Sequence, residues 1–118
     1  MTSYVMRRVI IFTHNFAAMR DFYRDMFGLE VVEEDDGWAD LAAGGCNIAI
    51  HAAGKGVKIG PDWEGPHKIV FHADDVAKAR EDLVSRGAKM GPVKIFGDLH
   101  LCDGDDPDGN RFQLSNRP

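Results

Sequence analysis

The residues most able to bind a metal or to catalyse a reaction are five histidines and two cysteines. The histidines are His14, His51, His67, His72 and His100. Each of them is more often a surface or structural residue than a ligand, since neutral imidazole serves both purposes. Cys46 and Cys102 stand in no metal or redox spacing, so we expect two reduced thiols. The sequence contains no C-x-x-C motif, glycine-rich phosphate loop or identifiable catalytic triad.

Length and composition indicate one globular domain of 118 residues, of which 44% are hydrophobic and 28% charged. The net charge of -5 argues against nucleic acid or an anionic membrane as a partner. No apolar run is long enough to span a membrane, and the N-terminal residues lack the apolar region of a signal peptide. We therefore expect a cytoplasmic protein.

A tight turn followed by a strand is predicted near the end of the chain. In Asp106-Pro107-Asp108-Gly109, Pro107 fixes φ, Asp108 can bond its own backbone, and Gly109 supplies a positive φ. The alternation that follows places Phe112 and Leu114 on one side of a strand, with Arg111 and Gln113 on the other.

Residues 5–52 predict a strand, a helix and three further strands. The run Val9–Phe12 is typical of a buried strand, and the helix should begin after Asn15 and end at Gly28. Further strands are expected at about 29–32, 38–41 and 46–52, with an acidic turn over 33–37. Between the helix ends, large apolar residues recur at helical spacing, and we predict that they face the core. They are Phe16, Met19, Phe22, Tyr23, Met26 and Phe27.

The same order of elements returns in residues 67–116, after a linker at about 53–66 that is rich in glycine and proline. A strand at 68–71 precedes a helix capped by Asp74 or Asp75, and three strands complete the module. Shifting the chain by about 60 residues places Arg8 on Lys68 and, after a longer loop, Ala49 on Gln113. An internal repeat of this length predicts two β-α-β-β-β modules.

Three motifs resemble the vicinal oxygen chelate superfamily, which contains glyoxalases, bleomycin-resistance proteins and ring-cleaving dioxygenases. They are the run from Phe22 to Leu29, the helix start Asp74-Asp75-Val76, and the turn from Asp106 to Asn110. The resemblance covers nearly the whole chain. It implies one α+β domain over residues 1–118, in which the two paired modules form curled mixed sheets around a cleft.

The resemblance also implies a metal held by one residue from the first strand and one from the last strand of each module. Those positions hold Arg8, Ala49, Lys68 and Gln113 here. Arginine and lysine repel a cation, alanine offers no ligand, and only the amide oxygen of Gln113 could bind weakly. We predict that the protein uses no metal and no other cofactor. The alternative is an offset metal site made of His51, His72 and Gln113.

The predicted function is to bind a small organic anion or aromatic acid without metal, for which the family offers a precedent in metal-free bleomycin-resistance proteins. Arg8 and Lys68 would supply charge and Gln113 a hydrogen bond. An apolar wall would come from Phe12, Trp38 or Trp63. Because most acidic residues fall in predicted turns or on helix faces, we expect an exogenous anion rather than an internal carboxylate to answer the two cations.

Two other functions remain open from the sequence. One is a metal-dependent enzyme of the family: a lyase, an isomerase or a ring-cleaving dioxygenase. The other is a structural or interaction subunit whose cleft is filled by its own side chains, with Arg8 bonded to internal carboxylates. We also expect a homodimer, as in relatives of similar length, since unpaired sheet edges invite association. A monomer mass by light scattering at micromolar concentration would contradict this expectation.

Overall fold

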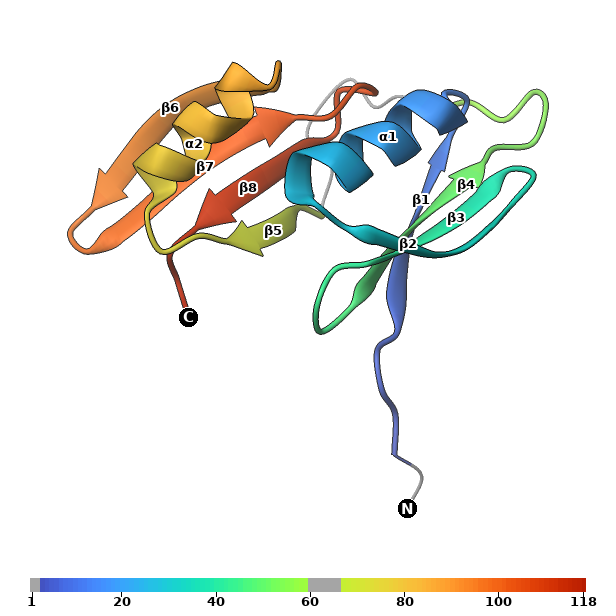
Figure 1. Cartoon of the computed structure of the whole chain (residues 1–118), viewed down its shortest axis with the longest axis horizontal. Coiled ribbons are helices and arrows are strands. Elements are labelled where there is room, and N and C mark those ends of the chain that lie inside the picture. The colour runs from blue at the N-terminus through green and yellow to red at the C-terminus, as the bar shows by residue number, and fades with distance from the viewer. Residues whose placement is uncertain (1–2, 60–66) are drawn as a thin grey trace. The chain divides into compact units, whose positions relative to one another are not determined.

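The computed structural model describes residues 3–59 and 67–118, and the chain divides into two units, Met1–Ile59 and Gly60–Pro118 (Figure 1). Each unit contains one helix and a four-stranded mixed sheet in the order β-α-β-β-β, as the sequence repeat predicts. The first unit contains β1 (Arg8–Thr13), α1 (Phe16–Phe27), β2 (Glu30–Asp35), β3 (Trp38–Ala42) and β4 (Asn47–Ala52). The second contains β5 (Ile69–His72), α2 (Val76–Ser85), β6 (Lys89–Phe96), β7 (Leu99–Asp105) and β8 (Arg111–Ser115).

The sheet of the first unit has the strand order β1-β4-β3-β2. β1 runs parallel to β4, whereas β3 pairs with β4 and β2 in antiparallel fashion. α1 packs against β3 and β4, and its Met19 and Tyr23 are buried. The structure thus places these two residues of the apolar helical stripe in the core.

The sheet of the second unit has the equivalent strand order, β5-β8-β7-β6. α2 packs against β6, β7 and β8, where Phe112 and Leu114 are buried while Arg111 and Gln113 are only partly covered. This is the alternation that the sequence predicts for the last strand. Gly104 lies opposite Phe112, and a Cβ there would come within 2.7 Å of the Phe112 ring. The close approach explains why β7 has a glycine at this position.

The helix ends follow local sequence signals. Gly28 takes the left-handed conformation with φ 63° at the end of α1, and Asp75 is the residue that caps α2, because its carboxylate accepts the Lys78 N–H. Asn15 occupies the N-cap position of α1, although its side chain makes no capping hydrogen bond. Neither of these two described helices is long and apolar enough to cross a membrane.

The last turn forms as predicted, with Gly109 at φ 83°. The side chain of Asp106 makes hydrogen bonds across it. The buried carboxylate of Asp106 accepts the backbone N–H groups of Asp108 and Asn110 at 3.0 and 2.9 Å. The prediction that Asp108 bonds its own backbone stays a prediction. Asp106 precedes the proline, and its side chain reaches forward over the turn.

Two expectations about the strands are corrected by the structure. β2 continues to Asp35 through the predicted acidic turn, because Glu33 and Asp35 pair with Asp40 and Trp38 of β3. Val9–Phe12 is not a fully buried strand, since Ile10 and Phe12 are 42% and 52% exposed. β1 is an edge strand, and these two side chains lie on the face turned away from α1.

Candidate functional site

An ion pair crosses the sheet of the first unit. Arg8 Nη2 lies 3.2 Å from Asp40 Oδ2, and Arg8 Nε donates to the same oxygen at 3.3 Å. Because β4 lies between β1 and β3, the Arg8 side chain must pass over β4 to reach Asp40. Ala49 is the residue of β4 directly opposite Asp40, and its small side chain leaves room for this crossing.

An equivalent ion pair crosses the sheet of the second unit. Lys68 Nζ lies 3.4 Å from both carboxylate oxygens of Asp103, on the far side of β8. Gln113 of β8 is directly opposite Asp103 and donates from Nε2 to Asp103 Oδ1 at 3.0 Å. The repeat therefore includes the acidic partner as well as the cation. We call Arg8–Asp40 and Lys68–Asp103 the cross-sheet ion pairs.

The cross-sheet ion pairs overturn the premise that no internal carboxylate answers Arg8 and Lys68. Asp40 and Asp103 lie inside strands, whereas the sequence analysis placed most acidic residues, Asp103 among them, in turns or on helix faces. A signal was present for Asp40, which is the single acidic residue in the run Trp38–Ala42, whereas Asp103 stands close to Asp105 and Asp106. Each also faces the last-strand position of its own module.

Asp40 is the more buried of the two acidic partners, because its side chain is 6% exposed and that of Asp103 is 23% exposed. The side chain of Arg8 is 39% exposed. The Oδ1 atom of Asp40 has no hydrogen-bond partner among the described residues. A buried carboxylate without a cation is strongly destabilising. Arg8 supplies the cation beside this buried carboxylate.

The side chains at the four positions expected to hold a metal are not suited to bind one. Arg8 and Lys68 bring positive charge, and Gln113 uses its amide to bind Asp103. No group of three histidine, cysteine or carboxylate side chains suited to a metal occurs within residues 3–59 or 67–118. The offset site of His51, His72 and Gln113 stays a prediction, since His51 belongs to the first unit and the other two to the second.

Two of the predicted wall residues, Phe12 and Trp38, form an aromatic cluster with His51 in the first unit. The His51 ring lies 5.3 Å from that of Phe12 and 5.6 Å from that of Trp38, and Trp38 Nε1 donates to Glu33 at 3.0 Å. An open hollow of about 370 Å³ adjoins Trp38 and His51. Its other lining residues are Glu33, Asp35, Asp36 and Gly37. This hollow is acidic, and Trp63, the remaining predicted wall residue, lies outside the described residues.

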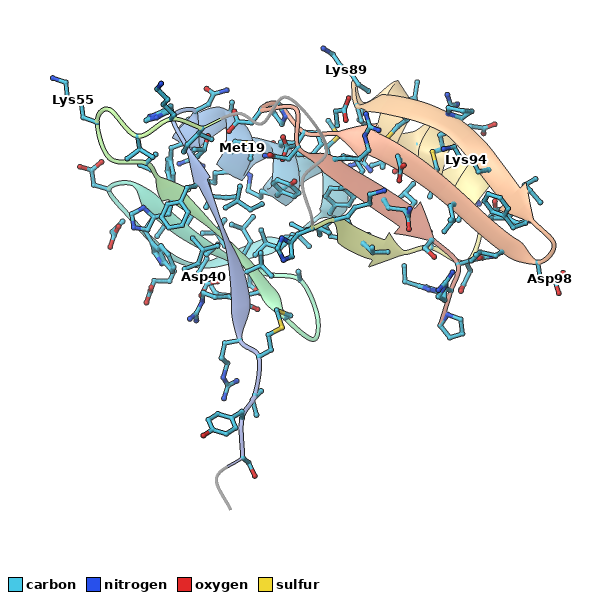
Figure 2. All side chains as sticks on the ribbon, turned by 180° about the vertical axis from the view of Figure 1, so that it is seen from behind. Met19, Asp40, Lys55, Lys89, Lys94 and Asp98 are labelled. Carbon is cyan, nitrogen blue, oxygen red and sulfur yellow. The ribbon has the colours of Figure 1, made fainter. Side chains whose placement is uncertain are left out.

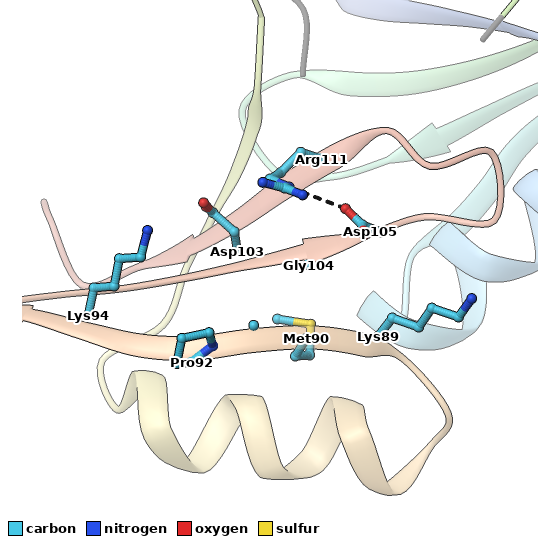
Figure 3. Close-up of a pocket in the computed structure, with 9 residues that line it drawn as sticks. Lys89, Met90, Pro92, Lys94, Asp103, Gly104, Asp105 and Arg111 are labelled. Carbon is cyan, nitrogen blue, oxygen red and sulfur yellow. Dashed lines mark hydrogen bonds and ion pairs between the residues drawn. The ribbon is translucent and has the colours of Figure 1, made fainter. Parts of the chain in front are cut away.

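A larger hollow, of about 440 Å³, lies in the second unit and contains residues that the sequence analysis missed (Figure 3). Its charged lining residues are Lys89, Lys94, Asp103, Asp105 and Arg111. Arg111 Nε and Asp105 Oδ1 form an ion pair at 3.2 Å, while Asp103 belongs to the cross-sheet pair with Lys68. Lys89 and Lys94 form no ion pair with any described residue, and both are exposed (Figure 2).

Comparison with known families identifies the class of this protein. The sequence model of the Glyoxalase/Bleomycin resistance protein/Dioxygenase superfamily matches residues 5–114. The chain therefore belongs to this superfamily, as the three sequence motifs indicate. The search of curated proteins gave no match.

Solved structures with the same fold include proteins of different kinds. A glyoxalase family protein from Enterococcus faecalis is 21% identical, with a TM-score of 0.80 over 93% of this chain and 95% of that one. The antibiotic-binding protein TnmS3 from Streptomyces sp. CB03234 is 19% identical, with a TM-score of 0.78 over 97% and 96%. Lactoylglutathione lyase from Agrobacterium tumefaciens is 18% identical, with a TM-score of 0.74 over 97% and 94%. At these identities the likeness shows the fold alone.

His72, a candidate ligand of the offset metal site, makes two contacts that each require a proton on its ring. Nδ1 lies 3.1 Å from the Arg117 carbonyl oxygen, and Nε2 lies 2.8 Å from Asp74 Oδ1. Both partners are acceptors, so both ring nitrogens donate only in the imidazolium form. The hydrogen bond to Asp74, followed by that to the Arg117 carbonyl, raises the pKa of His72 above its ordinary value.

We predict that His72 stabilises the second unit more in mild acid than at alkaline pH. A pKa raised by folding adds stability that is complete below the unfolded value of about 6.5 and is lost as pH rises through the folded value. The free energy of unfolding of wild type minus that of His72→Asn should therefore shrink between about pH 5 and pH 8. His67→Asn is the matched control. A His72 pKa at or below its ordinary value, measured by NMR titration, would contradict this prediction.

Proposed function

We propose that this chain is a metal-independent, small-molecule-binding member of its superfamily, and that it binds a small organic anion. The binding surface is the open face of the second sheet, the face turned away from α2. The observation that carries the proposal is the charge of this face. Lys68, Lys89, Lys94 and Arg111 lie there against two carboxylates, Asp103 and Asp105.

Because of the cross-sheet ion pairs, we give the predicted site residues different roles in this proposal. Arg8 is engaged by a buried carboxylate, so its role in this proposal is to support folding rather than to grip the ligand. Lys68 and Gln113 both bind Asp103, which leaves less of that negative charge to repel an anion nearby. The ligand is then bound in this proposal by Lys89 and Lys94, which have no ion-pair partner among the described residues.

The donor set supports a function without metal. Metal-dependent members need oxygen, nitrogen or sulfur ligands, and the residues in the equivalent positions here are two cations, an alanine and an amide that is already hydrogen-bonded. The fold is compatible with a binding role, because the antibiotic-binding protein TnmS3 shares it. The lyase shares it too, so the site residues must decide between these classes.

One observation favours a second candidate, a structural or interaction subunit. Both cross-sheet ion pairs answer a cation from within the same unit, which is the internal pairing expected of a site filled by its own side chains. The two candidates differ in one measurable property. The anion-binding protein has a saturable small-molecule ligand, whereas the structural subunit has none.

We predict that aromatic acids such as benzoate and salicylate bind the purified protein, and that a chelator changes neither their affinity nor the melting temperature. Positive charge on the open face attracts the carboxylate, and no metal takes part. Calorimetry before and after treatment with EDTA measures both effects, with benzyl alcohol as the uncharged control ligand. The proposal fails if no anion binds, or if binding disappears on chelation and returns with a divalent metal.

A further inference from the structure

We infer that the second sheet contains a site for a small organic dianion, between Lys89 and Lys94 beside the bulge of β6. This inference rests on the proposed function, since it places the anion on the same open face, and it adds the charge class of the ligand. The shared chemistry is a compact organic molecule with two negative charges. A phosphate monoester and a dicarboxylate both meet that description.

A β-bulge is what brings the two lysines to one face. They are five positions apart in β6, so a regular strand would point their side chains to opposite faces. The pairing with β7 shifts between Met90 and Val93, and Lys89 pairs with Asp105 while Lys94 pairs with Leu101. These partners are four positions apart and share a face, so the extra residue in β6 places both lysines on the open face.

The bulge is held from the helix side of the sheet. Arg80 of α2 donates from Nε to the Gly91 carbonyl oxygen at 2.6 Å, and the Cys102 thiol contacts the same oxygen at 3.3 Å. These contacts fix the backbone of β6 at the position where its pairing with β7 is interrupted. The relative position of the two lysines is therefore set by the fold.

The space beside the bulge suits a small organic molecule. Gly91 has no side chain, and Met90 and Pro92 add apolar surface to the hollow of about 440 Å³ (Figure 3). Ligand pockets in proteins commonly measure about 300–1,000 Å³ and combine apolar surface with a few polar groups. The organic part of a ligand can lie against Pro92, with its charged groups directed to the lysines.

The charges around the hollow favour a dianion over a monoanion. Asp105 is paired with Arg111, and Asp103 receives Lys68 and Gln113, so each carboxylate already has a donor. Lys89 and Lys94 have no ion-pair partner among the described residues. A lysine ammonium acts as a compact point charge, and a monoanion would neutralise the charge of only one of the two lysines. The register places the two lysine positions about 13 Å apart along the sheet, so a phosphate monoester or a dicarboxylate pairs with both when the flexible lysine side chains bend toward it.

The test is calorimetry at low ionic strength on the full chain, with phenyl phosphate, phthalate and benzoate as ligands. Wild type is compared with the double variant Lys89→Gln/Lys94→Gln. The control is Lys78→Gln, which removes one lysine charge from an exposed position of α2, the element on the opposite side of the sheet. We expect a dianion to bind wild type about tenfold or more tightly than benzoate, since each charge-assisted contact is worth about a factor of ten.

The double variant should lose about tenfold or more of its dianion affinity, and Lys78→Gln should lose none. A preference for phenyl phosphate identifies the ligand head group as phosphate, and a preference for phthalate identifies a dicarboxylate. The inference is overturned if benzoate binds as tightly as both dianions, or if the double variant binds them like wild type. Either result leaves the proposed function standing as long as wild type binds some anion. Failure of all three ligands to bind wild type overturns the proposed function itself.

Discussion

A carboxylate buried in a sheet needs a positive partner, and Asp40 has this partner in Arg8, two strands away. Burial removes the water that would otherwise stabilise the charge, so the 3.2 Å contact has to replace it. The contact constrains its surroundings, because Arg8 must cross β4, where the small side chain of Ala49 leaves room for it. Strand order, side-chain size and charge are therefore coupled at one place in the first unit.

The second unit repeats this arrangement with a different balance of charge. Lys68 is more flexible than arginine and reaches Asp103 at 3.4 Å, and Gln113 adds the hydrogen bond that Ala49 cannot offer. Asp103 consequently accepts hydrogen bonds from two side chains, Lys68 and Gln113. The neighbouring β6 then contributes two further lysines with no acidic partner in the described part of the chain. The repeat thus gives one sheet whose central charge is internally paired and another with positive charge left for a ligand.

The sequence predicts the fold well because its signals are local. Gly28 ends a helix through its own backbone freedom, Asp75 caps a helix through its own side chain, and the repeat requires only that similar residues recur. The site is harder to predict because it depends on pairing. Arg8 and Asp40 are 32 positions apart, and nothing local shows that their strands lie on either side of β4. The family resemblance singled out Arg8, Ala49, Lys68 and Gln113 but could not supply their acidic partners. Arg8, Ala49 and Gln113 lie in β1, β4 and β8, and Lys68 directly precedes β5.

The face to which a strand residue points explains two further differences between the sequence analysis and the structure. Ile10 and Phe12 are apolar residues of an edge strand, and hydrophobicity alone does not show which of its faces the helix covers. Lys89 and Lys94 are five positions apart, so a regular strand would point them to opposite faces. The bulge in β6 brings both to the same face. A bulge depends on the partner strand and on Arg80 from the helix, both of which are distant in sequence.

The most direct test of the central claim, that Arg8 serves to answer Asp40, is a double-mutant cycle on the free energy of unfolding in urea. The variants are Arg8→Met, Asp40→Asn and the two combined, with Arg7→Met as the matched control at an exposed neighbouring arginine. Because Arg8 itself is 39% exposed, we expect Arg8→Met to destabilise the protein by about 1–3 kcal/mol, less than for a fully buried pair. The combined variant should lose less than the sum of the single losses, by about 1 kcal/mol. Additive losses, or an effect of Arg8→Met no larger than that of Arg7→Met, would contradict the account.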